Sequence, residues 1–113
     1  MTKGKVVLVP FPFDDLSTNK VRPAVCLSEP LGSHKHVVLA FITSRTPSVL
    51  LETDLVIDAG HADFSATGLH VSSTLQLHRL MTVATSMIRR ELGSLSAALQ
   101  RDADVKLKKL FRL

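Results

Sequence analysis

The sequence predicts an α+β or mainly β fold, in which curled antiparallel strands form a small sheet or barrel that a C-terminal helix closes. Two observations support this prediction: apolar, β-branched runs of strand length come first, and a helical period comes last. Strands that do not alternate with helices exclude a parallel βαβ layout. Because 113 residues suffice for one domain and are too few for two ordinary ones, we expect a single domain over residues 1–113.

The expected strands are short apolar runs bounded by turn-forming residues. The first, Lys5–Phe11, is apolar without alternation, as in a strand that is buried on both faces. Pro10 and Pro12 restrict its end to a sheet edge or a bulge, because proline has no N–H to donate. Further strands are expected over Ala24–Ser28, His36–Thr43, Thr53–Ile57, Leu69–Leu77 and Leu80–Ala84.

Polar and turn-forming residues mark the connections between these strands. The run Asp14–Lys20 predicts an exposed loop, and the residues around Pro30–Ser33 predict a turn. Gly60–Gly68 is expected to be a loop with room for one helical turn. The segment Met87–Gly93 carries no clear pattern, so the sequence leaves it unassigned.

The C-terminal segment has the period of an amphipathic helix. Apolar side chains recur every three or four residues, at Leu95, Leu99, Ala103, Leu107 and Leu110. Ser94 or Ser96 supplies the N-cap oxygen. Cations gather at the carboxyl end, where the helix dipole favours them: Lys106, Lys108, Lys109 and Arg112.

The net charge of +4 is unevenly distributed along the chain. Residues 1–45 hold six basic and three acidic side chains, residues 46–78 hold four acids and no Lys or Arg, and residues 79–113 hold eight basic and three acidic side chains. Two basic ends around an acidic middle favour a surface that meets a polyanion on one face, although a solvated surface of this charge is also ordinary.

Composition excludes several classes of protein. The N-terminal apolar run is broken by Pro10 and Pro12, so we expect neither a signal peptide nor a membrane span. Cys26 is the only cysteine, which excludes an intramolecular disulfide and favours a cytoplasmic location. Trp and Tyr are absent, so stacking of bases on aromatic side chains is not expected to be the main means of binding.

Most motifs of catalysis are missing. The sequence has no Gly-rich phosphate loop and no GxSxG nucleophile elbow. His34 and His36 lack further ligands at a metal-binding spacing, so no metal site is expected. Cys26 lies within an apolar strand and is expected to pack as an unreactive thiol.

The residues best suited to bind a ligand or to take part in catalysis lie at two strand ends. Arg22 precedes Pro23, which holds it in extended geometry, ready to grip a phosphate through its planar fork. The alternative is a surface arginine paired with Asp14 or Asp15. The segment Thr43–Arg45 ends the most apolar strand with two hydroxyls and a guanidinium, where a rigid scaffold presents functional groups, or where a strand simply passes into a loop.

Five segments, in order, make the chain similar to a known family. They are Gly4–Phe13 (GKVVLVPFPF), Val21–Ser28 (VRPAVCLS), Leu39–Ser44 (LAFITS), Gly68–Ser73 (GLHVSS) and Ser86–Ser96 (SMIRRELGSLS). The chain resembles the MazF/PemK toxins of type II toxin–antitoxin systems. The resemblance implies a small SH3-like barrel with added helices, of MazF/PemK/CcdB-like architecture, working as a homodimer. It further implies an endoribonuclease without metal or other cofactor, which cleaves single-stranded mRNA by attack of the 2′-hydroxyl, leaving 2′,3′-cyclic phosphate and 5′-hydroxyl ends.

The resemblance also implies roles for particular residues. Arg22 matches the family's catalytic arginine before proline, and Thr43 matches its catalytic threonine at a strand end. Contacts to RNA are expected from Phe13, Asp14, Asp15, Ser17, Lys20, Ser44 and Arg45.

The loop before Arg22 departs from the family's pattern. Ser17 stands where many members have a glutamate, and Val21 stands where some have a histidine, so the usual candidates for the general base are missing. Asp14 or Asp15 substitutes, or the base is weak, or protons take another route. Because sequence preference depends on this loop, no RNA recognition sequence is carried over.

The expected partners follow from the same resemblance. We expect a cognate antitoxin with an acidic segment that covers the basic surface, with operator DNA bound only through the toxin–antitoxin complex and no membrane partner. Two alternatives stay open at this point. One is a non-enzymatic CcdB-like toxin that binds and poisons DNA gyrase, and the other is a basic RNA-binding barrel without activity.

Overall fold

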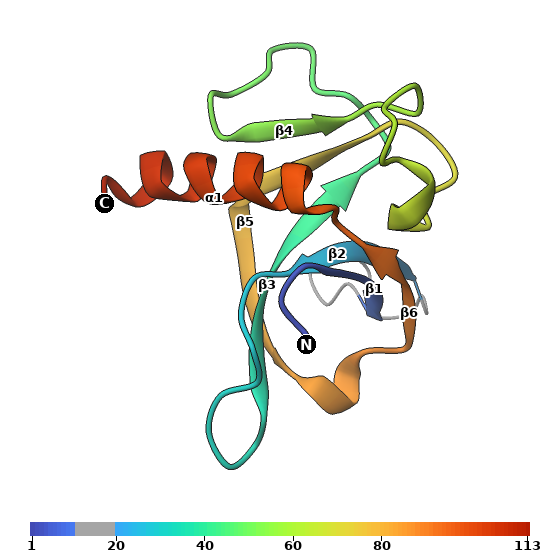
Figure 1. Ribbon diagram of the computed structural model, residues 1–113. Helices are drawn as coiled ribbons and strands as arrows, with labels where there is room; N and C mark the ends of the chain where they lie inside the picture. Colours follow the sequence, from blue (N-terminus) through green and yellow to red (C-terminus); the bar gives the residue numbers. More distant parts are fainter. Residues whose placement is uncertain (11–19) are drawn as a thin grey trace.

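A computed structural model describes residues 1–10 and 20–113 of the chain. Six strands form one sheet in the order β4-β5-β3-β2-β1-β6, and every neighbouring pair is antiparallel. Figure 1 shows that the sheet curls into a half-barrel, which α1 crosses on its outer side. The elements are β1 (Lys5–Pro10), β2 (Val21–Cys26), β3 (His36–Thr43), β4 (Asp54–Ile57), β5 (Ser73–Ala84), β6 (Arg90–Ser94) and α1 (Ala97–Phe111), with short 3-10 turns over Ser65–Thr67 and Thr85–Met87. The expected fold class is confirmed.

Two apolar cores explain why the central strands are hydrophobic on both faces. In β1, Val6 packs in the core between the sheet and α1, while Val7 and Val9 pack in the core inside the curl. Strand β3 alternates in the same way, with Ala40 in the first core and Phe41 in the second. Successive side chains of a strand point to opposite faces, so a strand between two cores needs an unbroken apolar run.

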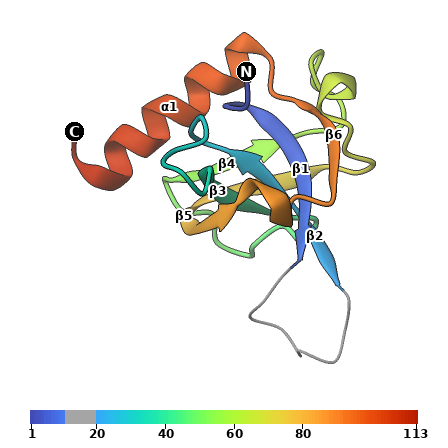
Figure 2. The same cartoon turned by 90° about the horizontal axis from the view of Figure 1, so that it is seen from below.

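The C-terminal helix forms where its apolar period predicts it. The Oγ of Ser96 caps it by accepting a hydrogen bond from the backbone N–H of Leu99 at 3.1 Å, while Ser94 ends β6. Leu99 and Ala103 are buried against the sheet. Figure 2 shows α1 along one side of the sheet, and Lys3 pairs with Asp104 of the helix at 3.6 Å.

Two expectations about the last strands are wrong. The segments Leu69–Leu77 and Leu80–Ala84 are not two strands, because β5 is a single strand of 12 residues that begins at Ser73. Its pairing with β3 shifts register at one point: Ala40 lies opposite Leu80, but the next residue, Phe41, lies opposite Gln76. The resulting bulge interrupts the apolar pattern without ending the strand.

Other boundaries differ by a few residues. Strand β2 begins at Val21 rather than Ala24, because it pairs with β1 through Arg22, which lies opposite Val9. Strand β6 occupies much of the unassigned segment and pairs with β1 at the sheet edge. The helical turn expected within Gly60–Gly68 is present as the 3-10 turn.

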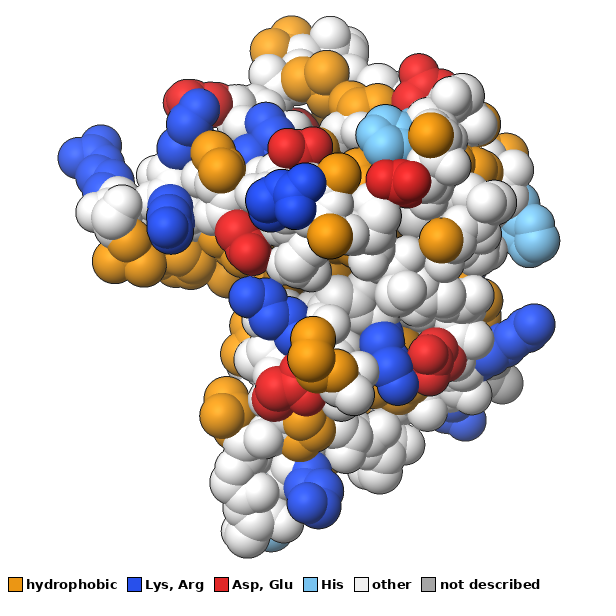
Figure 3. Space-filling view, viewed as in Figure 1, with side chains coloured by type: hydrophobic (Ala, Val, Ile, Leu, Met, Phe, Trp, Pro, Cys, Tyr) orange, Lys and Arg blue, Asp and Glu red, His pale blue; other side chains and the backbone are white. Residues whose placement is uncertain are grey.

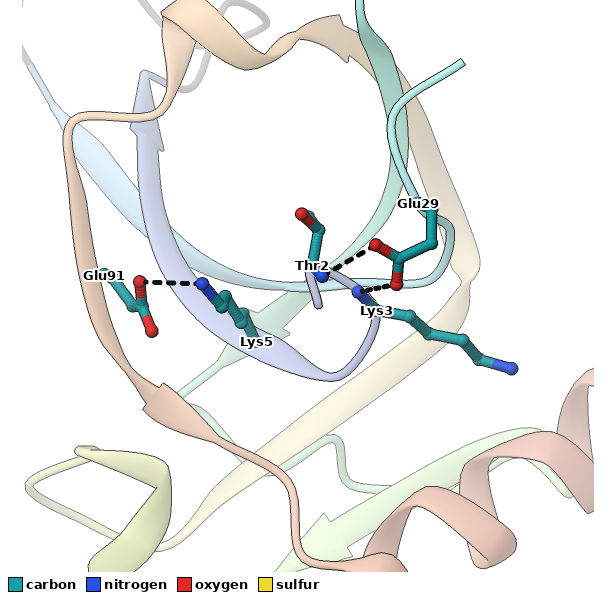
Figure 4. A network of polar contacts seen from close by, with 5 residues as sticks. All are labelled: Thr2, Lys3, Lys5, Glu29 and Glu91. Carbon is teal, nitrogen blue, oxygen red and sulfur yellow. Dashed lines mark hydrogen bonds and ion pairs between the residues drawn. The ribbon is translucent and has the colours of Figure 1, made fainter.

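The N-terminus is fastened to the sheet by polar contacts (Figure 4). The carboxylate of Glu29 accepts hydrogen bonds from the backbone N–H groups of Thr2 and Lys3, each at 2.8 Å. These two bonds stabilise the ionised form and lower the pKa of Glu29. Lys5 pairs with Glu91 of β6 at 3.2 Å.

Within the described residues, α1 is the only α-helix, and it is neither long nor apolar enough to span a membrane.

Candidate functional site

A cavity of about 390 Å³ opens where β2 begins and β3 ends. It is lined by Lys20, Arg22, Pro23, Phe41, Ile42, Thr43, Ser44, Arg45 and Arg79. Its volume falls within the range of about 300–1,000 Å³ that is usual for ligand sites. The cavity therefore lies at the two strand ends that the sequence singles out.

The strand register brings Arg22 and Thr43 together from distant parts of the chain. The pairing of β2 with β3 sets Ala24 opposite Phe41 and stops there, because Pro23 has no N–H to donate. Continuing the same register by two residues sets Arg22 opposite Thr43. Directly opposed residues share one face of a sheet, so both side chains lie on the face of Phe41, which is buried at the base of the cavity.

The hydroxyl of Thr43 shapes the turn that follows β3. Its Oγ1 accepts a hydrogen bond from the backbone N–H of Arg45 at 3.1 Å and lies 3.3 Å from the carbonyl oxygen of the same residue, to which it donates. Such a local bond turns the chain two residues after a threonine. The turn brings Ser44 and Arg45 into the lining of the cavity.

The cavity is strongly basic. Four cationic side chains line it, namely Lys20, Arg22, Arg45 and Arg79, and its described lining contains no carboxylate. Clefts lined by charge of one sign concentrate ligands of the opposite sign. The face drawn in Figure 3 is different, since Lys and Arg are interspersed there with Asp and Glu.

Five of the nine residues named from the sequence line this cavity: Lys20, Arg22, Thr43, Ser44 and Arg45. The other four, Phe13, Asp14, Asp15 and Ser17, lie outside the described residues. The alternative interpretation, a pairing of Arg22 with Asp14 or Asp15, also lies outside the described residues. Arg79 is the lining cation that sequence reasoning missed. The available signal was its place at the start of the basic C-terminal third, next to an apparent break between strands.

A row of polar side chains continues across the sheet from Thr43, of which Thr74 and Asp54 are buried and Gln76 is half-buried. Thr74 lies opposite Thr43, and Gln76 lies opposite both Phe41 and Asp54. Within the described part of the chain, Thr74 Oγ1, Gln76 Oε1 and Asp54 Oδ1 have no hydrogen-bond partner, although Asp54 Oδ1 lies 3.8 Å from Nδ1 of His78. An unpaired buried polar group costs about 1–3 kcal/mol, and this cost applies most directly to Thr74, whose side chain is fully buried.

Metal ligands and thiols do not gather at the cavity. In the ranges 1–10 and 20–113, no three His, Cys, Asp or Glu side chains lie close enough to hold a metal ion. His34 and His36 stand near each other, with their ring centroids 5.8 Å apart. Cys26 is buried, and burial raises the pKa of its thiol to about 11. The functional groups in the described lining of the cavity are therefore cationic side chains and hydroxyl groups.

A second hollow, of about 530 Å³, lies beneath the C-terminal half of α1. Figure 3 shows apolar side chains along the underside of this half of the helix. The hollow is lined by Lys3, Leu27, Ser28, Val38, Leu80, Asp104, Leu107, Lys108, Phe111 and Leu113. Its walls are mainly apolar, and charges of both signs stand at its rim.

Comparison with solved structures shows which proteins share this fold. The Mycobacterium tuberculosis toxin MazF-mt6 superposes with a TM-score of 0.72 at 19% identity, covering 96% of this chain and 97% of that one. MazF from Deinococcus radiodurans superposes with a TM-score of 0.71 at 18% identity, covering 100% and 97%. An endoribonuclease from a mycobacterial species, solved with its cognate antitoxin, gives 0.73 at 15% identity, covering 100% and 96%.

The family assignment comes from the sequence. No curated protein matches the chain significantly. A family model described as the PemK-like, MazF-like toxin of type II toxin–antitoxin systems matches residues 2–111. This match covers nearly the whole chain, including every described residue of the basic cavity. The chain therefore belongs to the PemK-like, MazF-like family of toxins from type II toxin–antitoxin systems.

Proposed function

We propose that this protein is the toxin of a type II pair and a metal-independent endoribonuclease that cleaves single-stranded mRNA in the basic cavity. The observation that carries this proposal is the meeting of Arg22 and Thr43 in a cavity with four cations and no carboxylate in its described lining. Family membership and the endoribonuclease names of similar structures support it. They do not favour the gyrase-poison alternative.

The chemistry needs no nucleophile from the protein. The 2′-oxygen of the ribose loses its proton and attacks the adjacent phosphorus, and the bond from phosphorus to the 5′-oxygen breaks. The leaving 5′-oxygen takes up a proton, so the products are a 2′,3′-cyclic phosphate and a 5′-hydroxyl. Negative charge on the phosphorane grows between these two events, and preorganised donors that meet it lower the barrier.

Each of the two paired residues has a role in this scheme. Arg22 grips the non-bridging oxygens through its planar fork, a geometry that a lysine does not offer. Thr43 donates its hydroxyl proton to a non-bridging oxygen while its oxygen keeps the bond from the N–H of Arg45. A hydroxyl donates only once, so this contact replaces the bond that Thr43 donates to the carbonyl oxygen of Arg45, whereas the bond that it accepts from the N–H of Arg45 is kept.

The direct test is to incubate the purified protein with a long RNA in excess EDTA and to sequence the new 5′ ends. We expect cleavage at a short recurrent sequence, with 5′-hydroxyl ends. An intact RNA would contradict the proposal, and loss of gyrase supercoiling in the same preparation would then establish the alternative.

We also propose that an acidic segment of the antitoxin covers the basic cavity. A mycobacterial relative was solved with its cognate antitoxin. Attraction between opposite charges at this site predicts that added salt weakens the complex. A complex that survives molar salt unchanged, with only the acidic region 46–78 protected, would contradict this assignment.

We propose further that the protein is a homodimer that uses the hollow beneath α1. An exposed apolar surface marks an interaction site. The rim of the hollow carries both Lys108 and Asp104, which suits a two-fold interface where each side presents the same pair. Sedimentation at micromolar concentration should give twice the 12.3 kDa of one chain, and a single monomer species would exclude the dimer.

A further inference from the structure

The bulge in β5 decides where the side chain of Arg79 lies. Residues 77–79 have no counterpart in β3, because Ala40 pairs with Leu80 and Phe41 pairs with Gln76. Leu77 and Leu80 both pack in the core beneath α1. In a regular strand, residues three apart point to opposite faces. The bulge thus leaves both intervening residues outside this core, and the second of them, Arg79, joins the lining of the cavity.

The described lining of the cavity has more cationic side chains than one phosphate group requires. A phosphodiester carries a single negative charge, and its phosphorane approaches two at most. Arg22 and Thr43 already meet that group in the proposed reaction. Lys20, Arg45 and Arg79 line the same cavity, and its volume of about 390 Å³ is large enough for more than a phosphate group.

Arg79 approaches the cavity from the side opposite to Arg22. Strand β3 lies between β5 and β2 in the sheet, so the backbones that carry the two arginines are two strand spacings apart. Neighbouring strands are about 4.7–4.9 Å apart, which places these backbones on the order of 10 Å from each other. Their guanidinium groups are therefore suited to two different groups on an RNA chain.

We propose that Arg79 binds the phosphate next to the scissile one, and that efficient cleavage requires this neighbouring phosphate to be charged. The proposal rests on the ribonuclease function proposed above and extends it to the substrate. The bulge in β5 is the structural feature that supplies this contact, in keeping with the role of bulges in re-aiming side chains near active sites.

The kinetic test combines a protein variant with a modified substrate. Once the cleavage sequence is mapped, short RNAs are made in which one phosphate, 5′ or 3′ of the scissile linkage, is a neutral methylphosphonate. For the wild-type protein, one of these two changes should lower kcat/KM about 10- to 100-fold, the effect of losing a hydrogen bond to a charged group. On the unmodified RNA, Arg79→Ala should lower kcat/KM by the same factor. On that methylphosphonate RNA, the variant should show no further loss, because the substitution and the modification remove the same contact and their effects are then not additive.

A binding measurement tests the contact without cleavage. An RNA with a 2′-O-methyl group at the scissile position is titrated at several salt concentrations. Each phosphate contact contributes about −0.7 to the slope of log K against log salt for a single strand, so Arg79→Ala should flatten that slope by about 0.7. Arg101→Ala is the matched control, because this exposed arginine lies on α1, outside the cavity. Its slope should equal that of the wild type.

The outcomes separate this inference from the proposed function. An unchanged salt slope in folded Arg79→Ala would overturn it, as would equal methylphosphonate effects in the variant and the wild type. If the wild type cleaves no RNA, the ribonuclease proposal fails; an unmodified RNA then needs no 2′-O-methyl group, and its salt slope still tests whether Arg79 contacts a phosphate. Should Arg79→Ala not fold, Arg79→Gln keeps the length of the side chain and removes the charge, and the same slopes are compared.

Discussion

Replacing Thr43 and Thr74 by valine should have opposite effects, although the two threonines lie directly opposite each other in the sheet. The hydroxyl of Thr43 holds the turn to Arg45 and, in the proposed reaction, meets the phosphorane. The hydroxyl of Thr74 is buried and has no partner within the described residues. The same substitution therefore removes a working hydroxyl in one case and an unpaired one in the other.

The expected changes in stability follow from these contacts. Thr43→Val removes both hydrogen bonds between the hydroxyl and the backbone of Arg45. Such a bond is worth about 0.5–1.5 kcal/mol, and the lower end applies to each because water can reach the exposed Arg45. Thr74→Val relieves an unpaired buried group and should gain up to about 1–3 kcal/mol. At roughly 4 °C per kcal/mol for a domain of this size, Tm should fall by about 2–4 °C in the first variant and rise by about 4 °C or more in the second.

The catalytic effects should differ more sharply. Loss of one donor to the transition state typically costs about 2.7–4 kcal/mol, so Thr43→Val should cleave RNA about 100- to 1,000-fold more slowly. Thr74→Val should keep the wild-type rate, and Thr43→Ser should retain more activity than Thr43→Val. Thermal melts and initial cleavage rates on one RNA measure both effects. Full activity in folded Thr43→Val would refute the role of this hydroxyl, and a lower Tm in Thr74→Val would refute the reading of the buried row.

Three further predictions concern stability. Because two backbone N–H groups lower the pKa of Glu29, its contribution to stability is present above its ordinary pKa of 4.5 and is lost as the pH falls through its lower pKa in the folded state. The difference in unfolding free energy between the wild type and Glu29→Gln should therefore shrink below about pH 4.5, and a constant difference would contradict this. Cys26, with a pKa of about 11, should resist iodoacetamide at pH 8 until urea unfolds the protein. Gly93→Ala places a methyl group against the backbone of Ala66 and should lower Tm, whereas Gly60→Ala makes only ordinary contacts and should not.

The parts of the fold that sequence predicts well are those with a strong apolar period. α1 forms over Ala97–Phe111 because its buried side chains recur at helical spacing and Ser96 caps it. Strand β3 was expected with its observed bounds because nearly every residue in it is apolar. In both cases the order of apolar residues within one continuous segment predicts which side chains are buried.

Strands whose formation depends on their pairing partners are not predicted by local apolar periodicity. Strand β6 (RELGS) has mostly exposed side chains, and its place is set by backbone pairing with β1 at the sheet edge. The bulge in β5 breaks the apolar alternation, so one strand resembles two. Both features depend on partners far along the chain, which local periodicity does not encode.

The same distinction applies to the candidate site. Arg22 and Thr43 stand out in the sequence as polar residues at strand ends, and their resemblance to family residues supplies their expected roles. Their meeting depends on the register between β2 and β3. Arg79 enters the cavity through the bulge, and the sequence shows this bulge only as an apparent break between two strands.

The measurement that tests the central claim most directly compares RNA cleavage by the wild type and by Arg22→Ala in excess EDTA. The account predicts cleavage by the wild type and a loss of about 100- to 1,000-fold in folded Arg22→Ala. Arg22→Lys should recover little, because a point charge does not reproduce the two-pronged grip on phosphate. Binding to an uncleavable RNA should weaken far less than the rate falls, since the charge that Arg22 meets is greatest in the transition state. Full cleavage by folded Arg22→Ala, with an unchanged Tm, would contradict the account.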